Sequence, residues 1–214
     1  MKKFILLLSA LLLSVQAQAA LVSVSSQGKI VNPPSVQEDS VLSRYQNKYY
    51  QFGFNEAQGV TLDRTIKIRG GTIAKGTKVD SHLIFLNSKG KTDVTKKATW
   101  EFSGDVLGVM TDSLGKDMAA TNDLFAYGKY FQEVTDHDPI GSQQWFKNLG
   151  LEGGGDFANY SSNFLKLGMH VTEPGDWIRV ITVSAVPIPA ALFLFAPALL
   201  GFLGLRRKVS STTA

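Results

Sequence analysis

Short runs of β-branched and aromatic residues alternate with polar residues through most of the chain. A period of two is clear at Leu21–Ser25, Val60–Asp63 and Ile66–Arg69, where apolar side chains occupy every second position. This alternation predicts β-strands with one buried face. Further strands are predicted at Val79–Leu86, Thr99–Phe102, Val106–Met110 and Trp177–Val183.

Turn-forming residues separate most of these predicted strands. Asn87–Gly90 and Ser103–Asp105 are clusters of the Gly, Asp, Asn and Ser residues that favour turns. Many short strands with frequent turns are typical of all-β folds, so we predict a mainly β, single antiparallel β-sandwich, jelly-roll-like, with a barrel as the alternative. The stretches Asp117–Tyr127 and Gln143–Leu151 lack the strand pattern and predict two short helices.

The N-terminal segment has the three-part pattern of a secretory signal peptide. After a basic start, Phe4–Val15 is an apolar run, and Ala17 and Ala19 then occupy the −3 and −1 positions of a cleavage site. We therefore expect export through the Sec translocon, with signal peptidase cutting before Ala20. Residues 1–19 are excluded from the expected fold.

A second hydrophobic segment lies near the C-terminus. Val186–Leu205 is 20 residues long without a charge, and Arg206, Arg207 and Lys208 follow it directly. About 20 apolar residues span the hydrocarbon core as a helix, and a basic cluster keeps its end of the helix in the cytoplasm. The pattern predicts a transmembrane helix that places the main body outside the inner membrane, with residues 209–214 as a cytoplasmic stub.

A short proline motif opens this segment. It consists of Val186, Pro187, Ile188, Pro189, Ala190 and Ala191. With the apolar helix and the basic stop that follow, Val186–Lys208 resembles the PEP-CTERM sorting signal in its VPxPA variant. The resemblance implies processing near the motif by an exosortase, a membrane-embedded cysteine peptidase of Gram-negative bacteria, and an association with exopolysaccharide and biofilm matrix. No glutamate lies between the two prolines, where the motif that names the family has one.

The charge of the part between these two ends differs from that of the whole chain. The chain has 22 Lys and Arg residues against 18 Asp and Glu, a net charge of +4. Five of the basic residues lie in residues 1–19 and 186–214, which leaves 17 basic against 18 acidic residues in the 166 residues 20–185. No nucleic-acid partner is expected, because phosphate recognition needs a basic surface. The chain contains no cysteine, which excludes disulfides and thiolate chemistry.

Motifs for enzymatic chemistry are weak. Gly90–Thr92 ends like a phosphate-binding loop but has no glycine five positions earlier, and Gly153–Gly155 does not open a helix, so both predict turns. The three histidines lie in a predicted strand, a loop and another strand, with no signature that joins them. They are His82, His137 and His170, and we expect His82 to be a hydrogen-bonded sheet residue.

Residues 136–141 begin like an oxygen-rich calcium loop. Asp136 and Asp138 occupy positions 1 and 3, but Ile140 stands at position 5 and Lys147 at position 12. Calcium held by Asp136 and Asp138 is the metal hypothesis, and a solvated turn is the simpler interpretation. Other acidic loop residues contribute if the fold gathers them: Asp112, Asp117, Asp123, Glu152 and Asp156.

Two further hypotheses concern glycans. Exposed aromatic rings stack on sugars, so a carbohydrate-binding module is an alternative function, with core packing as the simpler interpretation of the rings. The rings are Tyr45, Tyr49, Tyr50, Phe52 and Phe54, and then Tyr127, Tyr130, Phe131 and Trp145. A glycan hydrolase would need two carboxylates about 5–9 Å apart. Its candidates are Asp105, Asp112, Asp136, Asp138 and Glu152.

The main hypothesis from the sequence is a non-enzymatic, exported cell-surface or extracellular-matrix protein. Its expected parts are a signal peptide (1–19), a β-sandwich ectodomain (20–185), a sorting signal with a transmembrane helix (186–208) and a stub (209–214). The expected partners are the Sec translocon, signal peptidase, an exosortase-like peptidase, the inner membrane and exopolysaccharide. No cofactor is expected apart from the calcium hypothesis.

Overall fold

The computed structural model describes part of the chain. The described residues are 20–31, 50–87, 93–125, 150–171 and 175–184. They all belong to one compact unit, Ala19–Ala185. The predicted signal peptide, the predicted sorting signal and most of the predicted helix Gln143–Leu151 lie outside them. Within the described residues, no helix has the length and apolar character needed to cross a bilayer.

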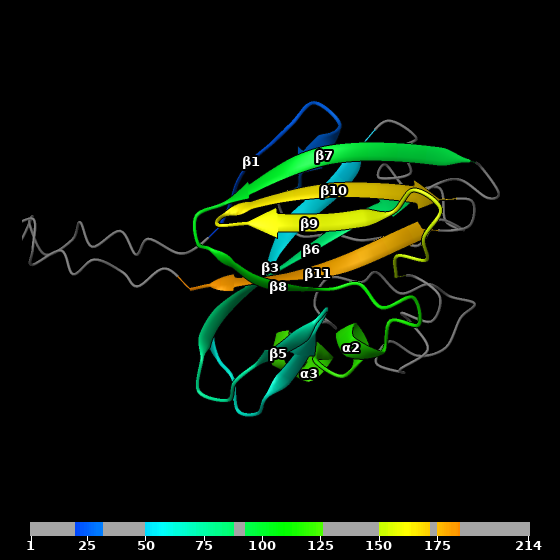
Figure 1. Ribbon diagram of the computed structural model, residues 1–214. Coiled ribbons are helices and arrows are strands. Elements are labelled where there is room, and N and C mark those ends of the chain that lie inside the picture. The colour runs from blue at the N-terminus through cyan, green and yellow to red at the C-terminus, as the bar shows by residue number, and fades with distance from the viewer. Residues whose placement is uncertain (1–19, 32–49, 88–92, 126–149, 172–174, 185–214) are drawn as a thin grey trace, which may run out of the picture. The chain divides into compact units, whose positions relative to one another are not determined.

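Two sheets pack face to face, so the fold is mainly β and β-sandwich-like, as the alternation of residues predicts (Figure 1). Sheet A has the strand order β1 (Leu21–Val24), β7 (Val94–Phe102), β10 (Phe164–Val171) and β9 (Phe157–Ser161). Sheet B has the order β2 (Gly28–Ile30), β3 (Gln51–Thr61), β6 (Lys78–Asn87), β11 (Gly175–Val183) and β8 (Val106–Met110). Neighbouring strands run antiparallel except β2 and β3, which are parallel and correct the expectation of a purely antiparallel sheet.

An apolar core fills the space between the two sheets. Trp100 and Leu167 enter it from sheet A and Ile178 from sheet B, and all three are fully buried. Gln51 of sheet B crosses this core, because its side-chain Oε1 accepts a hydrogen bond from Trp100 Nε1 (2.9 Å) and its Nε2 donates to the Leu167 carbonyl (3.1 Å). Gly53 lies under the Trp100 ring, where a Cβ would come within 2.7 Å of it. One polar side chain of sheet B is thus hydrogen-bonded to two residues of sheet A across the core.

Sheet B is buried on its opposite face as well. Phe85 and Trp177 pack there in a second apolar core, with ring centroids 5.5 Å apart. The covering layer consists of β4 (Ile66–Ile68), β5 (Gly71–Ile73), α2 (Lys116–Ala119) and α3 (Asn122–Phe125). Figure 1 shows β5, α2 and α3 on the side of β11 that faces away from sheet A. Because both faces of sheet B are covered, its strand β11 is buried at every position except the last, including its polar residues Asp176, Arg179 and Thr182.

The predicted helix Asp117–Tyr127 is wrong in its extent. In its place lie two four-residue helices, α2 and α3, separated by Ala120 and Thr121. The Thr121 hydroxyl lies within 3.0 Å of the carbonyls of Asp117 and Met118, so it bonds to the backbone of the preceding turn. Hydroxyl side chains that bond to local backbone in this way compete with helix continuation.

Candidate functional site

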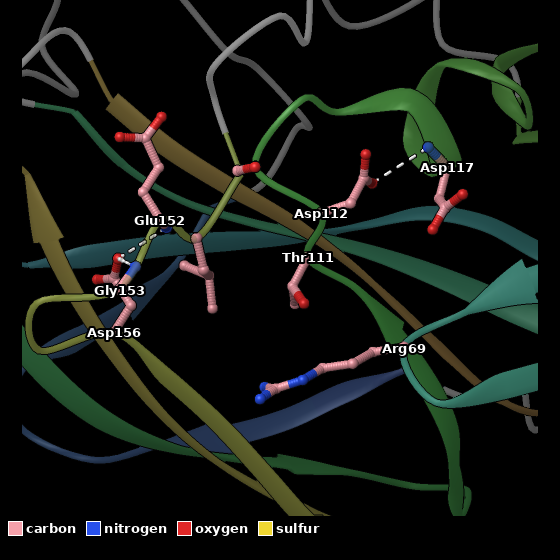
Figure 2. Close-up of a pocket in the computed structure, with 9 residues that line it drawn as sticks. Arg69, Thr111, Asp112, Asp117, Glu152, Gly153 and Asp156 are labelled. Carbon is pink, nitrogen blue, oxygen red and sulfur yellow. Dashed lines mark hydrogen bonds between the residues drawn. The ribbon is translucent and has the colours of Figure 1, made fainter.

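A polar pocket of about 380 Å³ lies where three loops meet: the turn after β4, the segment after β8 and the loop before β9 (Figure 2). Leu151 and Gly153 supply its non-polar and backbone surface. Its polar side chains are those of Arg69, Thr111, Asp112, Ser113, Asp117, Glu152 and Asp156. Four of the five acidic loop residues singled out in the sequence are therefore gathered around one cavity.

Asp112 is held by the backbone of α2. It is the second residue after β8, and its carboxylate accepts hydrogen bonds from the amides of Lys116 (2.6 Å) and Asp117 (3.1 Å). The first amides of a helix have no partner within the helix, so an acidic side chain placed just before it satisfies them. Asp112 therefore has a fixed position on one wall of the pocket.

Asp156 is held in a similar way by the loop before β9. Its carboxylate accepts hydrogen bonds from the amides of Glu152 (3.1 Å), Gly153 (3.2 Å) and His170 (2.6 Å). The glycines at 153, 154 and 155 all have positive φ angles, between 71 and 142°, which side chains other than hydrogen rarely allow. The prediction of a turn at Gly153–Gly155 is confirmed, and this turn places Asp156 on the second wall.

Close backbone contact brings the two walls together. The amide of Leu151 donates to the Thr111 carbonyl at 3.2 Å. A Cβ at Gly150 would overlap the carbonyl oxygen of Asp112, so only glycine permits this approach. Glu152 comes next in the chain, and its exposed carboxylate therefore reaches the same pocket as Asp112, a residue 40 positions earlier.

The charge of the pocket lining is strongly negative. Arg69 is the single basic side chain among the lining residues, and its Nη1 lies 3.5 Å from the Ala158 carbonyl. Lys67 approaches from outside, with its Nζ 3.7 Å from a carboxylate oxygen of Asp117. Four carboxylates against one guanidinium favour a ligand with positive charge, and Arg69, Thr111 and Ser113 add hydrogen-bond donors for polar atoms.

A buried acid lies next to this pocket. Asp176 is the second residue of β11 and points to the same side as Ile178, toward the inter-sheet core against which Leu151 also packs. Asp176 is only 8% exposed, and its Oδ2 has no hydrogen-bond partner within the described part of the chain. Burial raises the pKa of Asp176 to about 8, helped by the negative charges of Asp156 and Glu152. The carboxyl is therefore mainly protonated at neutral pH.

The two described histidines do not meet. His82 is fully buried, with its ring nitrogens 2.8 Å from Asn55 Oδ1 and 3.0 Å from Thr182 Oγ1, which confirms the expectation of a hydrogen-bonded sheet residue. Burial lowers the pKa of His82 to about 3, so the ring is neutral. His170 lies with its Nε2 3.1 Å from Asp93 Oδ1. His137 is outside the described residues.

The remaining candidates from the sequence lie elsewhere. Asp105 accepts a hydrogen bond from the Ser162 hydroxyl, and Asp123 pairs with Arg64. Among the described residues, no three His, Asp or Glu side chains are grouped closely enough to hold a metal ion. The calcium candidates Asp136 and Asp138 lie outside the described residues, as do Ala17, Ala19, Val186–Ala191 and Arg206–Lys208.

The aromatic residues that the structure describes are mostly core residues. Phe52 is 2% exposed and Phe54 is fully buried, both in the second core, so their rings are not accessible to a glycan. Tyr50 is half-buried against Phe52. Core packing is thus the correct interpretation for Phe52 and Phe54. Tyr45, Tyr49, Tyr127, Tyr130, Phe131 and Trp145 lie outside the described residues.

Sequence reasoning missed Arg69, Thr111, Ser113 and Asp176. Arg69 and the two hydroxyl residues carry no signal of their own, since polar residues at strand ends are ordinary. Asp176 differs from them, because it is an acid directly before the mainly apolar run Trp177–Val183, which is predicted as a strand. In the comparisons with known proteins, no family model matches the chain, and neither a curated protein nor a solved structure gives a match.

Proposed function

We propose that this chain is an exported, non-enzymatic protein of the cell surface or extracellular matrix. It is made with a removable N-terminal signal and a C-terminal membrane tail that is processed during sorting. The observation that carries the proposal is the order of proline motif, 20-residue uncharged segment and basic cluster in residues 186–208. We also propose that the β-sandwich is jelly-roll-like.

The extent of the β-sandwich-like unit supports this division of the chain. The compact unit spans Ala19–Ala185, and its last described strand, β11, ends at Val183. Only residues 184 and 185 separate the end of this strand from Val186 in the sequence, so the proline motif follows the folded domain directly along the chain. In this arrangement Arg206, Arg207 and Lys208 stop translocation.

The hydrogen-bond partners and the burial of the acidic residues support a non-enzymatic role. Asp112 and Asp156 are occupied by backbone amides, and both described histidines are held in the sheets. A glycan hydrolase needs one carboxylic acid that protonates the leaving group and one free carboxylate beside it. Glu152 is a free carboxylate in the pocket, but Asp176, the protonated acid, is buried below the lining.

Cell fractionation tests the proposal. Replacement of Arg206, Arg207 and Lys208 by glutamine should release the precursor from the inner-membrane fraction, because the stop to translocation is lost. Deletion of residues 209–214 is the control and should leave the fractionation unchanged. Intact mass of the protein recovered outside the cell should correspond to a start at Ala20 and an end near the proline motif. Unchanged membrane retention of the glutamine variant would contradict the proposal.

A further inference from the structure

The acidic pocket before β9 is shaped for an organic ligand of several atoms. Its volume of about 380 Å³ falls in the range of about 300–1,000 Å³ that is usual for small-molecule sites. The four acids line this cavity from the segment after β8, from α2 and from the loop before β9, and within the described residues no three of them converge as metal ligands do. The arrangement therefore suits a group with hydrogen-bonding atoms spread over one or two rings.

Two carboxylates of the pocket are held in place before any ligand binds. Backbone amides fix the carboxylates of Asp112 and Asp156. Both oxygens of Asp112 and Oδ1 of Asp156 accept one amide each and keep a further lone pair for a ligand, whereas Oδ2 of Asp156 already accepts from two amides. The Glu152 carboxylate is exposed at the rim. Acceptors that are already held in place lose little conformational entropy when a ligand binds, so each hydrogen bond contributes more to the affinity.

Asp176 is a further acidic group close to this pocket, although it is not among the residues that line it. Its carboxyl is more than nine-tenths buried, its Oδ2 has no hydrogen-bond partner within the described part of the chain, and the charges of Asp156 and Glu152 act on it from the pocket loop. Buried polar atoms without partners are rare in folded proteins, and each one calls for a specific explanation. A positively charged ligand group in the pocket would reduce the repulsion between the carboxylates of Glu152 and Asp156, while an anionic ligand would add to it.

We propose that this pocket binds a sugar residue that carries a protonated amino group, within an exported polysaccharide. The ammonium group lies among Glu152, Asp156 and Asp112, where it forms charge-assisted hydrogen bonds. The sugar hydroxyls accept from Arg69 and bond with Ser113 and Thr111. The inference deepens the proposed function, because it gives the surface or matrix protein a partner of defined chemistry.

Calorimetric titration of the full-length chain in detergent tests this inference. The probe is a tetramer of β-1,4-linked glucosamine, with the fully N-acetylated tetramer as the neutral analogue and a galacturonate tetramer as the anionic one. Binding of the amine tetramer is expected to be about tenfold tighter than that of the acetylated one. It should weaken as salt is added, and the galacturonate tetramer should bind least.

Glu152→Gln is the decisive variant, because Glu152 is exposed and its loss leaves the fold intact. It should weaken binding of the amine tetramer about tenfold and that of the acetylated tetramer much less. Glu101→Gln makes the same chemical change on β7, where the carboxylate accepts a hydrogen bond from Ser23 Oγ (2.7 Å), and should leave tetramer binding unchanged. Equal binding by the two variants, or no binding of the amine tetramer, overturns the inference.

Calcium chloride alone is the remaining arm of the experiment. Calcium binding that is tighter than binding of the amine tetramer, and that is lost in Glu152→Gln, would make the pocket a metal site and overturn the inference. The proposed function is tested separately. A chain that fractionates as expected but binds no tetramer contradicts only the sugar assignment, while tetramer binding without membrane retention contradicts only the sorting proposal.

Discussion

Arg179 and Asp176 lie three positions apart on β11, and the fold treats these two buried ionisable groups in opposite ways. Arg179 faces the second core, is fully buried and donates to both carboxylate oxygens of Glu56, at 2.7 and 2.6 Å. Asp176 faces the inter-sheet side and leaves Oδ2 without a partner among the described residues. Arg179 therefore keeps its charge, whereas Asp176 keeps its proton at neutral pH.

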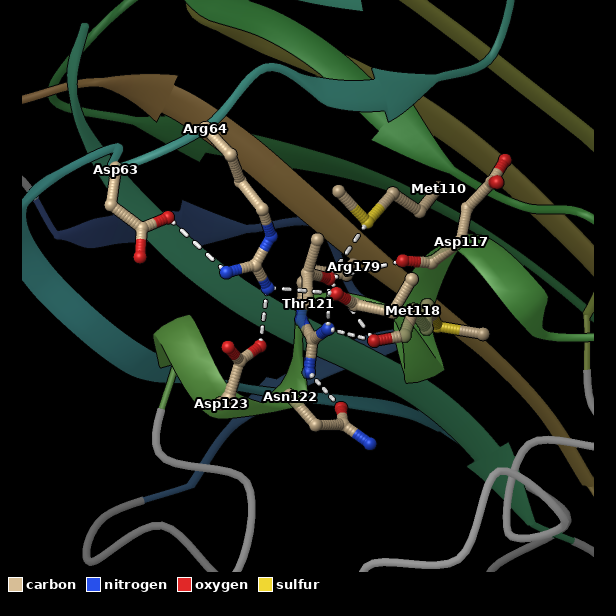
Figure 3. Close-up of polar contacts among 10 residues, drawn as sticks. Asp63, Arg64, Met110, Asp117, Met118, Thr121, Asn122, Asp123 and Arg179 are labelled. Atoms are coloured by element: carbon tan, nitrogen blue, oxygen red, sulfur yellow. Dashed lines mark hydrogen bonds and ion pairs between the residues drawn. The ribbon is translucent and has the colours of Figure 1, made fainter. Parts of the chain in front are cut away.

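The partners of Arg179 show what it does in the fold (Figure 3). Its Nη1 donates to the Met118 carbonyl (2.6 Å) and to Thr121 Oγ1 (2.7 Å), and its Nη2 to Asn122 Oδ1 (3.0 Å). The guanidinium also lies 5.3 Å from the centroid of the Phe125 ring. Arg179 thus attaches α2 and α3 to sheet B. The comparison teaches that a buried charged group is kept where each of its hydrogen-bond donors has an acceptor, as at Arg179. A buried carboxyl whose oxygens lack such partners binds a proton instead, as at Asp176.

The largest effect is expected from removal of the matched charge. Arg179→Met leaves the buried Glu56 carboxylate without its cation, which costs about 3–5 kcal/mol of unfolding free energy. Denaturant unfolding followed by circular dichroism measures it. The double variant Glu56→Gln/Arg179→Met should recover part of the loss, because no buried charge is then left alone. A loss below about 1 kcal/mol in the single variant would show that Arg179 is not the main attachment of the helices.

Removal of the unmatched acid should have a smaller effect, with the opposite sign. The folded-state pKa of Asp176, about 8, lies above its ordinary value of 3.8, so the unfolded chain releases the proton first and stability falls as pH rises between these values. Asp176→Asn does not titrate. It should match the wild type near pH 4 and exceed it at pH 9 by about 1–3 kcal/mol.

Denaturant unfolding at a series of pH values measures this difference. Asp63→Asn is the matched control, since Asp63 is an exposed acid whose side chain is 67% exposed. It should leave the pH dependence of the wild type in place. Parallel pH curves for the wild type and Asp176→Asn would contradict the buried, proton-holding state of Asp176.

The smallest effect is expected at the exposed counterpart of Arg179. Arg64 also contacts the helical layer, through Asp123 Oδ1 (2.5 Å) and the Ala120 carbonyl (3.0 Å), but its side chain is 39% exposed. Arg64→Ala should cost no more than about 0.5–1 kcal/mol, and the difference should shrink in 1 M salt. A loss comparable to that of Arg179→Met would mean that burial does not decide the contribution of these two arginines.

The strands that could be predicted from the sequence are those in which runs of β-branched and apolar residues are bounded by turn-forming residues. Val106–Met110 is a strand with the predicted bounds, and Val79–Leu86 and Trp177–Val183 lie inside β6 and β11. The alternation of residues predicted only the end of β3. Its first half is covered on both faces of the sheet and contains the buried polar residues Gln51 and Glu56, so buried positions there do not coincide with apolar ones. The apolar pattern alone does not distinguish a strand buried on two sides from other buried segments.

The candidate site could be predicted only in its parts. Asp112, Asp117, Glu152 and Asp156 are recognisable as loop acids, since each follows or precedes a strand or turn in the sequence. Their meeting depends on the hydrogen bond between Leu151 and Thr111, which joins segments 40 residues apart. Spacing along the chain carries no information about such a contact, because loop closure over this distance is decided by the packing of the sheets.

The sequence by itself determined the charge distribution, the absence of cysteine chemistry, the β-rich character and the turn at Gly153–Gly155. These properties depend on composition or on the conformations that a few adjacent residues allow. Tertiary structure alone decided that sheet B has a core on each face, that Arg179 finds Glu56 and that Asp176 remains protonated beside the acidic pocket. The physical reason is that burial and the distance between charges are properties of segments packed together, and a pKa or an ion pair exists only once they are packed.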